Sequence, residues 1–237
     1  MYGPHGPRFL DLARQALSSV EGGYDLLAPT FDHTPFRTPE AVATRLVDEA
    51  LRGHPVRDAL DLCCGTGALL EGMLGRVEGH LEGVDLSRAM LAQCRRRLGD
   101  AGRSVALTHG DATRLEYREQ FDLVVSAGAF GHFTTVDQEA VVDGVFRALR
   151  PGGRFVFVTA RPAPLGSAAW CRVAAFDAAM RLRNLVWSPR FVMYYASFRW
   201  PSIVKLFTRR GFSLRVREGA FSDAWARAVL VSAQRSR

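Results

Sequence analysis

Residues 59–67, Ala-Leu-Asp-Leu-Cys-Cys-Gly-Thr-Gly, constrain the fold of this 237-residue chain more than any other segment. The first four predict a short buried strand. Gly65 and Gly67 then permit positive φ angles and a close approach of the main chain to a bound molecule. The next residues, Ala-Leu-Leu-Glu, are typical of a helix start whose free N–H groups face the same place. The segment therefore predicts a strand, a glycine turn and a helix that border a ligand site.

Strand and helix patterns alternate along the chain after this point. Apolar runs predict strands near 56–62, 80–85, 104–108, 121–126 and 153–159. Helical patterns are expected near 67–75, 87–98 and 136–149. A last helix, begun by Pro201 and ended by Gly211, precedes two further strands near 212–218 and 226–233. Apolar strands separated by helices predict an α/β fold with a parallel sheet covered on both faces.

The residues before the first strand predict helices and one irregular stretch. A helix is expected from Phe9 to Val20, ended by Gly22-Gly23, with an irregular segment over residues 24–32. A second helix is expected to reach Leu51, with Thr38 as its cap and Pro39 in its first turn.

A second acid narrows the kind of ligand. Asp85 ends the strand expected near 80–85, 18 residues after Gly67, where a carboxylate suits a ribose diol. Both a dinucleotide and S-adenosylmethionine carry such a ribose. A dinucleotide fingerprint needs a third glycine where this chain has Leu70. Asp61, at the end of the first strand, would repel a pyrophosphate but attract the ammonium of a methionine moiety. These residues favour S-adenosylmethionine.

Five segments, in order, resemble the motifs of the class I S-adenosylmethionine-dependent methyltransferases. They are residues 61–67, the ribose-binding acid in 84–87, the adenine turn in 109–112, the fourth strand in 121–126 and the turn into the fifth strand in 149–155. The similarity covers roughly residues 20–160 and returns in the last thirty, and the chain is most similar to the small-molecule, methyltransferase-11/25-like type. This resemblance implies a Rossmann-like, seven-stranded, mostly parallel sheet with helices on both faces and an antiparallel C-terminal hairpin.

The resemblance also implies S-adenosyl-L-methionine as the cofactor. Asp61 would orient its ammonium, Asp85 would accept from both ribose hydroxyls, and Asp111 with the Ala112 N–H would read the adenine. Aromatic residues of an N-terminal Tyr-Asp-x-x-Ala-x-x-Phe-Asp pattern would cover the cofactor. The expected cofactor-binding residues are Tyr24, Phe31, Asp61, Cys63, Gly65, Thr66, Gly67, Asp85, Leu86, Asp111, Ala112, Ala127 and His132.

Few residues are candidates for catalysis, because methyl transfer from a sulfonium depends mainly on alignment. His132, after the fourth strand, is the best-placed general base if the acceptor must lose a proton, and it is equally interpreted as a wall residue. His33 is a lesser candidate. The Asn/Asp-Pro-Pro-aromatic motif of adenine and glutamine methyltransferases is absent after the fourth strand. The four cysteines have no metal-site spacing, are expected to be small buried apolar residues, and predict no metal.

Positive charge is concentrated near the C-terminal end. Residues 161–217 contain eleven arginine and lysine residues against Asp177 alone, a charge of +10, whereas the whole chain carries +7. Residues 170–200 of this segment are also rich in aromatic side chains. After the fifth strand, such an insertion is expected to form a lid or acceptor pocket, although simple packing against the core is an equal interpretation. Contact with an anionic membrane or lipid headgroup is a third, and nucleic acid ranks below these.

These observations predict four regions and one leading function. The regions are an N-terminal helical cap over 1–40, a cofactor-binding core over 41–160, an inserted lid or acceptor region over 161–200, and a closing helix and hairpin over 201–237. The function is methyl transfer to a small hydrophobic or lipid-like acceptor at O, N or C. RNA or protein methylation, a non-catalytic S-adenosylmethionine-binding protein and a nicotinamide-dependent oxidoreductase are the alternatives. With no apolar run long enough to span a bilayer and no secretory pattern at the N-terminus, a cytoplasmic location is expected.

Overall fold

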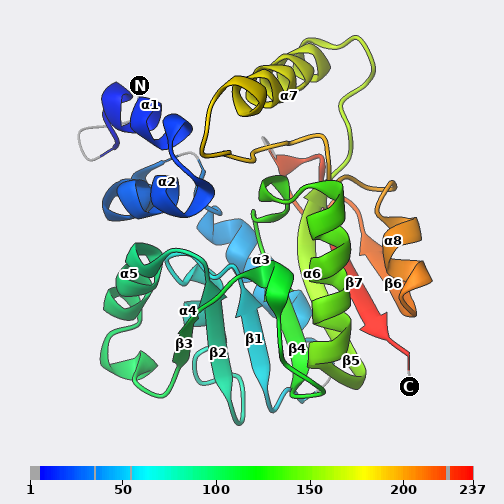
Figure 1. The fold of residues 1–237 in the computed structure, drawn as a ribbon. Helices are drawn as coiled ribbons and strands as arrows, with labels where there is room; N and C mark the ends of the chain where they lie inside the picture. Colours follow the sequence, from blue (N-terminus) through cyan, green and yellow to red (C-terminus); the bar gives the residue numbers. More distant parts are fainter. Residues whose placement is uncertain (1–5, 35, 54, 223–224, 237) are drawn as a thin grey trace.

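A single sheet of seven strands organises the computed structural model, which describes residues 6–34, 36–53, 55–222 and 225–236 (Figure 1). The order across the sheet is β3-β2-β1-β4-β5-β7-β6, with β1 to β5 parallel and β7 antiparallel to both neighbours. The strands are β1 (Ala59–Leu62), β2 (Leu81–Asp85), β3 (Ala106–His109), β4 (Phe121–Ser126), β5 (Leu149–Ala160), β6 (Phe212–Arg217) and β7 (Ala228–Arg235). This architecture confirms the predicted Rossmann-like sheet. Residues 1–5, part of the N-terminal segment without a secretory pattern, lie outside the described residues.

Helices cover both faces of this sheet (Figure 1). The α-helices are α1 (Phe9–Leu17), α2 (Val20–Leu27), α3 (Glu40–Ala50), α4 (Ala68–Met73), α5 (Arg88–Leu98), α6 (Thr135–Ala148), α7 (Ala168–Val186) and α8 (Val204–Arg209). The short 3₁₀ helices are η1 (Ala28–His33), η2 (Gly99–Gly102), η3 (Ala112–Arg114) and η4 (Phe130–His132). Helices α6 and α8 pack on one face and α3, α4 and α5 on the other, which leaves α1, α2 and α7 beyond the carboxyl edge of the parallel strands.

Strand β1 shows how the two cores are divided. Its residues are all buried, and Leu60 and Leu62 point into the core under α6. Ala59 points into the opposite core, under α3, α4 and α5. Because side chains alternate along a strand, Asp61 shares the face of Ala59. A carboxylate is therefore carried into the interior at the end of a central strand.

Gly22-Gly23 does not end a helix, contrary to the prediction. The break lies earlier, at Ser18 and Ser19, and α2 begins there because the Ser19 side chain accepts from the Gly22 N–H. Gly23 continues the helix because it needs to be small: a Cβ at this position would lie 2.7 Å from the Phe191 ring. The segment expected to be irregular is the end of α2 followed by η1.

Smaller differences concern where elements begin. Helix α3 starts at Glu40 with Pro39 in the N-cap position and no side-chain cap, so the prediction that Thr38 caps it was wrong. Pro201 lies in a turn, and α8 begins only at Val204. Gly211 does follow the end of α8, in the left-handed region with φ 89°.

Candidate active site

A cavity of about 320 Å³ lies at the carboxyl edge of the parallel strands. Residues that follow β1, β2, β3 and β4 form its floor, and residues of α2, η1 and the segment before α3 form its roof. Twelve of the thirteen predicted cofactor-binding residues line it: Tyr24, Phe31, Asp61, Cys63, Gly65, Thr66, Asp85, Leu86, Asp111, Ala112, Ala127 and His132. The cavity thus joins segments that are more than 100 positions apart in the sequence.

Gly67 is the predicted site residue that does not line the cavity. It is the N-cap of α4 and has φ 86°, in the left-handed region. A Cβ at Gly67 would lie 2.5 Å from the Cys94 Sγ atom. Its role is therefore to let the turn after β1 approach α5, and not to face a ligand.

The turn after β1 holds Asp85 in place. The Gly65 N–H donates to Asp85 Oδ2 at 2.8 Å, and the Ser87 N–H donates to Oδ1 at 2.9 Å. Burial, the largest effect, raises the pKa of Asp85, although these two N–H groups oppose the shift. Since each oxygen keeps a further lone pair, the carboxylate can still accept from hydroxyl groups of a ligand.

Asp61 is the most unusual group of the cavity. Its exposed fraction is 1%, and within the part of the chain that the structure describes neither carboxylate oxygen has a hydrogen-bond partner. Burial raises its pKa well above the usual range, and the charges of Cys94 and Asp85 add to this. The nearby Leu70 N–H, whose geometry does not make a hydrogen bond to the carboxylate, opposes the shift. A buried carboxylate without a partner is costly unless a cation joins it. A positively charged group placed beside Asp61 would remove this cost.

Asp111 is fixed by its own turn. One of its oxygens, Oδ1, accepts from the Thr113 N–H and from the Thr113 hydroxyl, both at 2.8 Å, at the start of η3. The other oxygen lies 4.0 Å from the Arg114 guanidinium. That oxygen remains open to a donor, beside the buried Ala112.

Tyr24 and His132 form a half-buried, hydrogen-bonded pair in the cavity lining. The Val192 carbonyl lies 2.7 Å from His132 Nδ1, which must donate to it. His132 Nε2 is then an acceptor, so the Tyr24 hydroxyl donates to it at 2.7 Å. Burial lowers the pKa of His132 and raises that of Tyr24, so both are neutral near pH 7. His132 Nε2 is thus occupied by Tyr24 and cannot act directly on an acceptor.

Two acidic residues, Asp25 and Asp32, connect the roof of the cavity to its floor by hydrogen bonds. The sequence had not identified either as a site residue. Asp25 accepts from the Ser87 hydroxyl at 2.6 Å and from the Ala89 N–H at 3.1 Å. Asp32 accepts from the Thr66 hydroxyl at 2.8 Å and pairs with Arg97 at 3.4 Å. Both acids belong to the N-terminal Tyr-Asp and Phe-Asp pattern, which was interpreted only through its aromatic residues.

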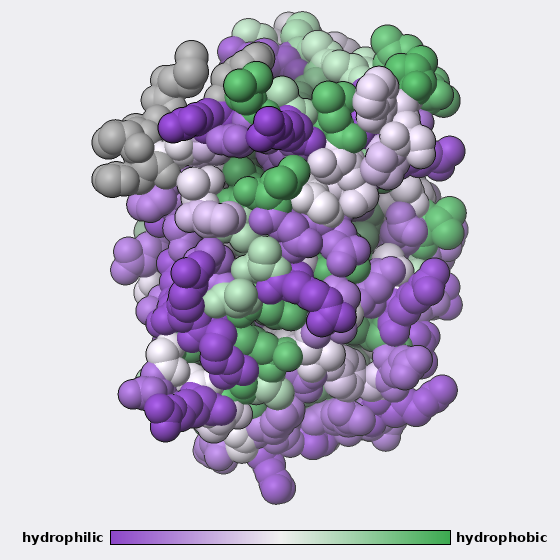
Figure 2. Space-filling view, turned by 60° about the vertical axis from the view of Figure 1, so that its left-hand side comes forward, coloured by the Kyte–Doolittle hydropathy of each residue, from purple (hydrophilic) through white to green (hydrophobic). Residues whose placement is uncertain are grey.

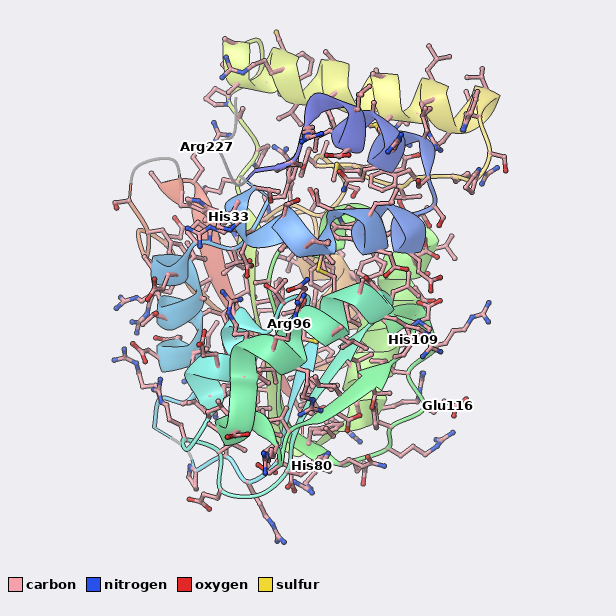
Figure 3. The ribbon with its side chains drawn as sticks, turned by 90° about the vertical axis from the view of Figure 1, so that its left-hand side faces the viewer. His33, His80, Arg96, His109, Glu116 and Arg227 are labelled. Atoms are coloured by element: carbon pink, nitrogen blue, oxygen red, sulfur yellow. The ribbon has the colours of Figure 1, made fainter. Side chains whose placement is uncertain are left out.

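The insertion over residues 161–200 does not line the cavity, which differs from the expected lid or acceptor pocket. It supports the cavity wall from behind: the Tyr194 N–H donates to the Gly131 carbonyl at 2.6 Å, next to the His132–Val192 bond. His33, the lesser base candidate, is also outside the lining; it ends η1, and Figure 3 shows it left of the centre of the molecule, with His109 to the right.

Several lining residues are not among the predicted cofactor-binding residues, although Phe36, Gly128 and Phe133 lie in the two segments, 24–36 and 128–133, that were expected to border the cavity. They come from the segment before α3 and from the region after β4: Phe36, Arg37, Thr38, Gly128, Phe133 and Asp137. A Cβ on Gly128 would lie 3.7 Å from the Thr38 hydroxyl, so the two segments meet. No sequence pattern identifies Arg37, Thr38 and Asp137 as lining residues, because only the fold brings them to the cavity.

The described residues also bear on metal binding, disulfide formation and membrane crossing. In the described ranges, His, Cys, Asp and Glu form no group of three or more that could hold a metal ion. All four cysteines are free, but Cys171 is exposed and Cys63 is half-buried, so the prediction that all four are buried was wrong. Among the described residues, no helix has both the length and the apolar composition needed to cross a bilayer.

Comparison with known proteins agrees with this geometry. Residues 59–153 match a family described as a methyltransferase domain. The chain is 37% identical over 125 residues to a demethylmenaquinone methyltransferase of Thermus thermophilus, covering 52% of this chain and 56% of the relative. It is 31% identical over 147 residues to a demethylmenaquinone methyltransferase of Listeria welshimeri, covering 60% of each. The chain thus spans less than two thirds of the length of these curated relatives.

The fold is shared over nearly the whole chain with a solved structure. The N-methyltransferase NodS from Bradyrhizobium japonicum, in complex with S-adenosyl-L-homocysteine, superposes with a TM-score of 0.63. The match covers 97% of this chain and 98% of NodS at 17% identity, and therefore reports on the fold alone. The matched domain, the sequence relatives and the shared fold agree with one another. Residues 59–153 are similar to a methyltransferase domain, and the chain resembles methyltransferases in sequence and in fold.

Proposed function

We propose that the protein transfers a methyl group from S-adenosylmethionine to a small hydrophobic or lipid-like acceptor. The observation that carries the proposal is the Asp61 carboxylate, which is buried in the cavity wall without a partner. The ammonium group of the methyl donor would give this carboxylate the partner that it lacks. A pyrophosphate-containing dinucleotide would instead place negative charge near both Asp61 and Asp85.

The other donor-binding contacts follow from groups that keep free hydrogen-bonding capacity. Asp85 would accept from the two ribose hydroxyls with the lone pairs that Gly65 and Ser87 do not use. Asp111 would accept from the adenine amino group with its second oxygen, next to the Ala112 N–H. When bound, the sulfonium supplies the methyl group and loses its charge on transfer, which a partly apolar cavity favours.

The Tyr24–His132 pair suits an acceptor that must lose a proton. Its O–H or C–H proton would move to the Tyr24 oxygen, while the Tyr24 proton moves to His132 Nε2. The Val192 carbonyl, which holds Nδ1–H, would stabilise the resulting imidazolium. In the same step the sulfur–carbon bond breaks and the bond between the methyl carbon and the acceptor forms. Tyr24 is therefore the group in contact with the acceptor, and His132 is the base behind it.

The nature of the acceptor is supported by the apolar side chains of the cavity. Phe31, Phe36 and Phe133 line it together with Thr38. The two curated relatives named above are demethylmenaquinone methyltransferases, which supports a quinone-derived, lipid-like acceptor for this chain as well.

The donor is tested by isothermal titration calorimetry. The wild-type protein is expected to bind S-adenosylmethionine and not NAD, and Asp85→Ala should weaken binding at least about tenfold, because each hydrogen bond to a carboxylate contributes about 1.5–3 kcal/mol. Binding of NAD alone would show that the site takes a dinucleotide.

The acceptor is tested by transfer of a labelled methyl group. Demethylmenaquinone should become labelled in its reduced, quinol form, which carries the hydroxyl proton that the Tyr24–His132 pair would remove, whereas the oxidised quinone, RNA and an unrelated protein should not. Labelling of RNA or protein would overturn the acceptor class. Donor binding without any labelling would support a non-catalytic protein.

A further inference from the structure

Helix α7 turns two polar side chains, Asp177 and Asn184, toward the protein and leaves several large apolar side chains exposed to solvent. Asp177, the one acid of residues 161–217, is buried and accepts from the Tyr195 and Ala196 N–H groups at 2.9 and 3.0 Å. Two turns later, Asn184 pairs with the backbone of Phe191 and with the Tyr194 hydroxyl. These bonds secure the inner face of α7 to residues 191–196. A surface helix of a soluble protein normally has the opposite arrangement.

The outward face of α7 is apolar and continues onto α1. Leu182, Leu185 and Val186 are 62%, 81% and 74% exposed, and Trp187 is 51% exposed. The Trp187 indole N–H donates to the Leu17 carbonyl at 3.2 Å, which places the exposed Leu17 side by side with them. We call Leu17, Leu182, Leu185, Val186 and Trp187 the α7 patch. Figure 2 shows hydrophobic residues gathered at the top of the molecule, the end at which α7 and α1 lie in Figure 1.

Exposed arginines lie on α7, on the loop after it and on α1, and residues 161–217 contribute no exposed acid. Arg172, Arg181 and Arg190 are exposed on α7 and the loop after it, whereas Asp177 is buried. Arg14 is exposed on α1, whose acid, Asp11, is engaged by the Arg8 N–H. An apolar strip flanked by arginines is complementary to a bilayer with anionic headgroups and apolar tails. Trp187 adds an aromatic ring of the kind that settles at the bilayer interface.

We propose that the α7 patch docks the protein onto the surface of an anionic phospholipid bilayer. Leu182, Leu185, Val186 and Trp187 would enter the headgroup region while the arginines contact phosphate groups. The patch lies beyond the carboxyl edge of the sheet, the edge that also holds the cavity (Figure 1). Docking would therefore bring the cavity toward the phase in which a lipid-like acceptor dissolves. The contact itself does not depend on the proposed reaction.

Vesicle co-sedimentation tests the proposal with a matched pair of variants. Leu185→Glu alters the patch, and Val136→Glu makes the same change at a residue 75% exposed on α6. The wild-type protein should sediment with vesicles containing phosphatidylglycerol, and less with pure phosphatidylcholine or at high salt. Leu185→Glu should lower the partition coefficient about tenfold, the amount expected for one leucine side chain withdrawn from an apolar phase. Val136→Glu should leave it within about twofold.

Two controls keep the result interpretable. Calorimetry with S-adenosylhomocysteine should give the same affinity for Leu185→Glu as for the wild type, which shows that the variant is folded, and failure of the wild type to bind this ligand would affect the proposed function alone. Sedimentation velocity distinguishes a bilayer from a second copy of the chain. A wild-type dimer that Leu185→Glu dissociates, no binding to anionic vesicles, or an equal loss in Val136→Glu would each overturn membrane docking.

Discussion

Replacing Asp61 by asparagine is expected to stabilise the protein on its own while weakening its affinity for the methyl donor. The carboxylate is 1% exposed and without a hydrogen-bond partner, so the folded protein bears the cost of a buried unpaired charge. Asparagine has nearly the same shape and carries no charge. The same change removes the group that would hold the ammonium of the donor.

The size of both effects can be worked out from this environment. An unpaired buried polar group costs about 1–3 kcal/mol and a charged one costs more. Asparagine keeps the first cost and removes only the extra cost of the charge, so Asp61→Asn should raise the free energy of unfolding by about 1 kcal/mol or more. For a chain of this length, each kcal/mol raises Tm by about 2–4 °C. A lost hydrogen bond between an ammonium and a carboxylate costs about 1.5–3 kcal/mol, which weakens donor binding about 10- to 100-fold.

The pH dependence of the stability gives a second check on whether Asp61→Asn stabilises or destabilises the protein. Burial raises the folded-state pKa of Asp61 above its unfolded value, so its charged form is disfavoured in the folded state. The penalty is absent below the unfolded pKa of about 3.9, and it grows as the pH rises through the folded-state pKa. The stabilisation by Asp61→Asn should therefore be larger at about pH 8 than at about pH 5.

Thermal unfolding without ligand and calorimetry with S-adenosylhomocysteine measure the two effects. Asp85→Asn is the matched control, because Asp85 accepts from the Gly65 and Ser87 N–H groups and should lose both stability and affinity. A lower Tm for Asp61→Asn, or an unchanged affinity, would refute the reasoning.

Three further substitutions test other parts of the account. Tyr24→Phe should reduce kcat about 10²-fold with little change in donor affinity, because it removes the hydroxyl that bonds to His132. Burial lowers the pKa of His132, so the wild-type rate should stay constant as the pH falls to 6.5, the ordinary histidine pKa, and should decrease only below it. An unchanged kcat would assign Tyr24 to packing alone. Gly67→Ala should lower the free energy of unfolding, measured by chemical denaturation, by about 2–4 kcal/mol, because it adds a clash with Cys94 to a left-handed backbone. Gly75 also has a left-handed backbone but has open space around it, so Gly75→Ala should cost only about 1–2 kcal/mol. Thr134→Ala should cost about 1 kcal/mol, because its side chain caps α6, and equal losses in Thr135→Ala would contradict this role.

The parts of the fold that depend on neighbouring residues could be predicted from the sequence. Strand β4 lies at residues 121–126 as expected, because Phe121 and the apolar residues 123–125 stand between the polar Gln120 and Ser126. The carboxylates of Asp61 and Asp85 could be placed in one cavity because parallel strands end at the same edge. In each case a short pattern and a general rule of sheet geometry were sufficient.

The parts that depend on distant contacts could not be predicted. Gly23 stays inside a helix because Phe191 packs against it, and the two residues are far apart in the sequence. Likewise, His132 looked like a free base until Val192 determined its tautomer and Tyr24 occupied its second nitrogen. The insertion carries aromatic residues suited to a pocket, but its hydrogen bonds through Asp177 and Asn184 turn its apolar face outward.

A crystal structure of the protein with S-adenosylhomocysteine tests the central claim most directly. We expect the ligand in the cavity between β1, β2 and η1, with its ammonium on Asp61 and its ribose hydroxyls on Asp85. A ligand bound elsewhere, or an Asp61 carboxylate that stays without a cationic partner in the complex, would contradict the account.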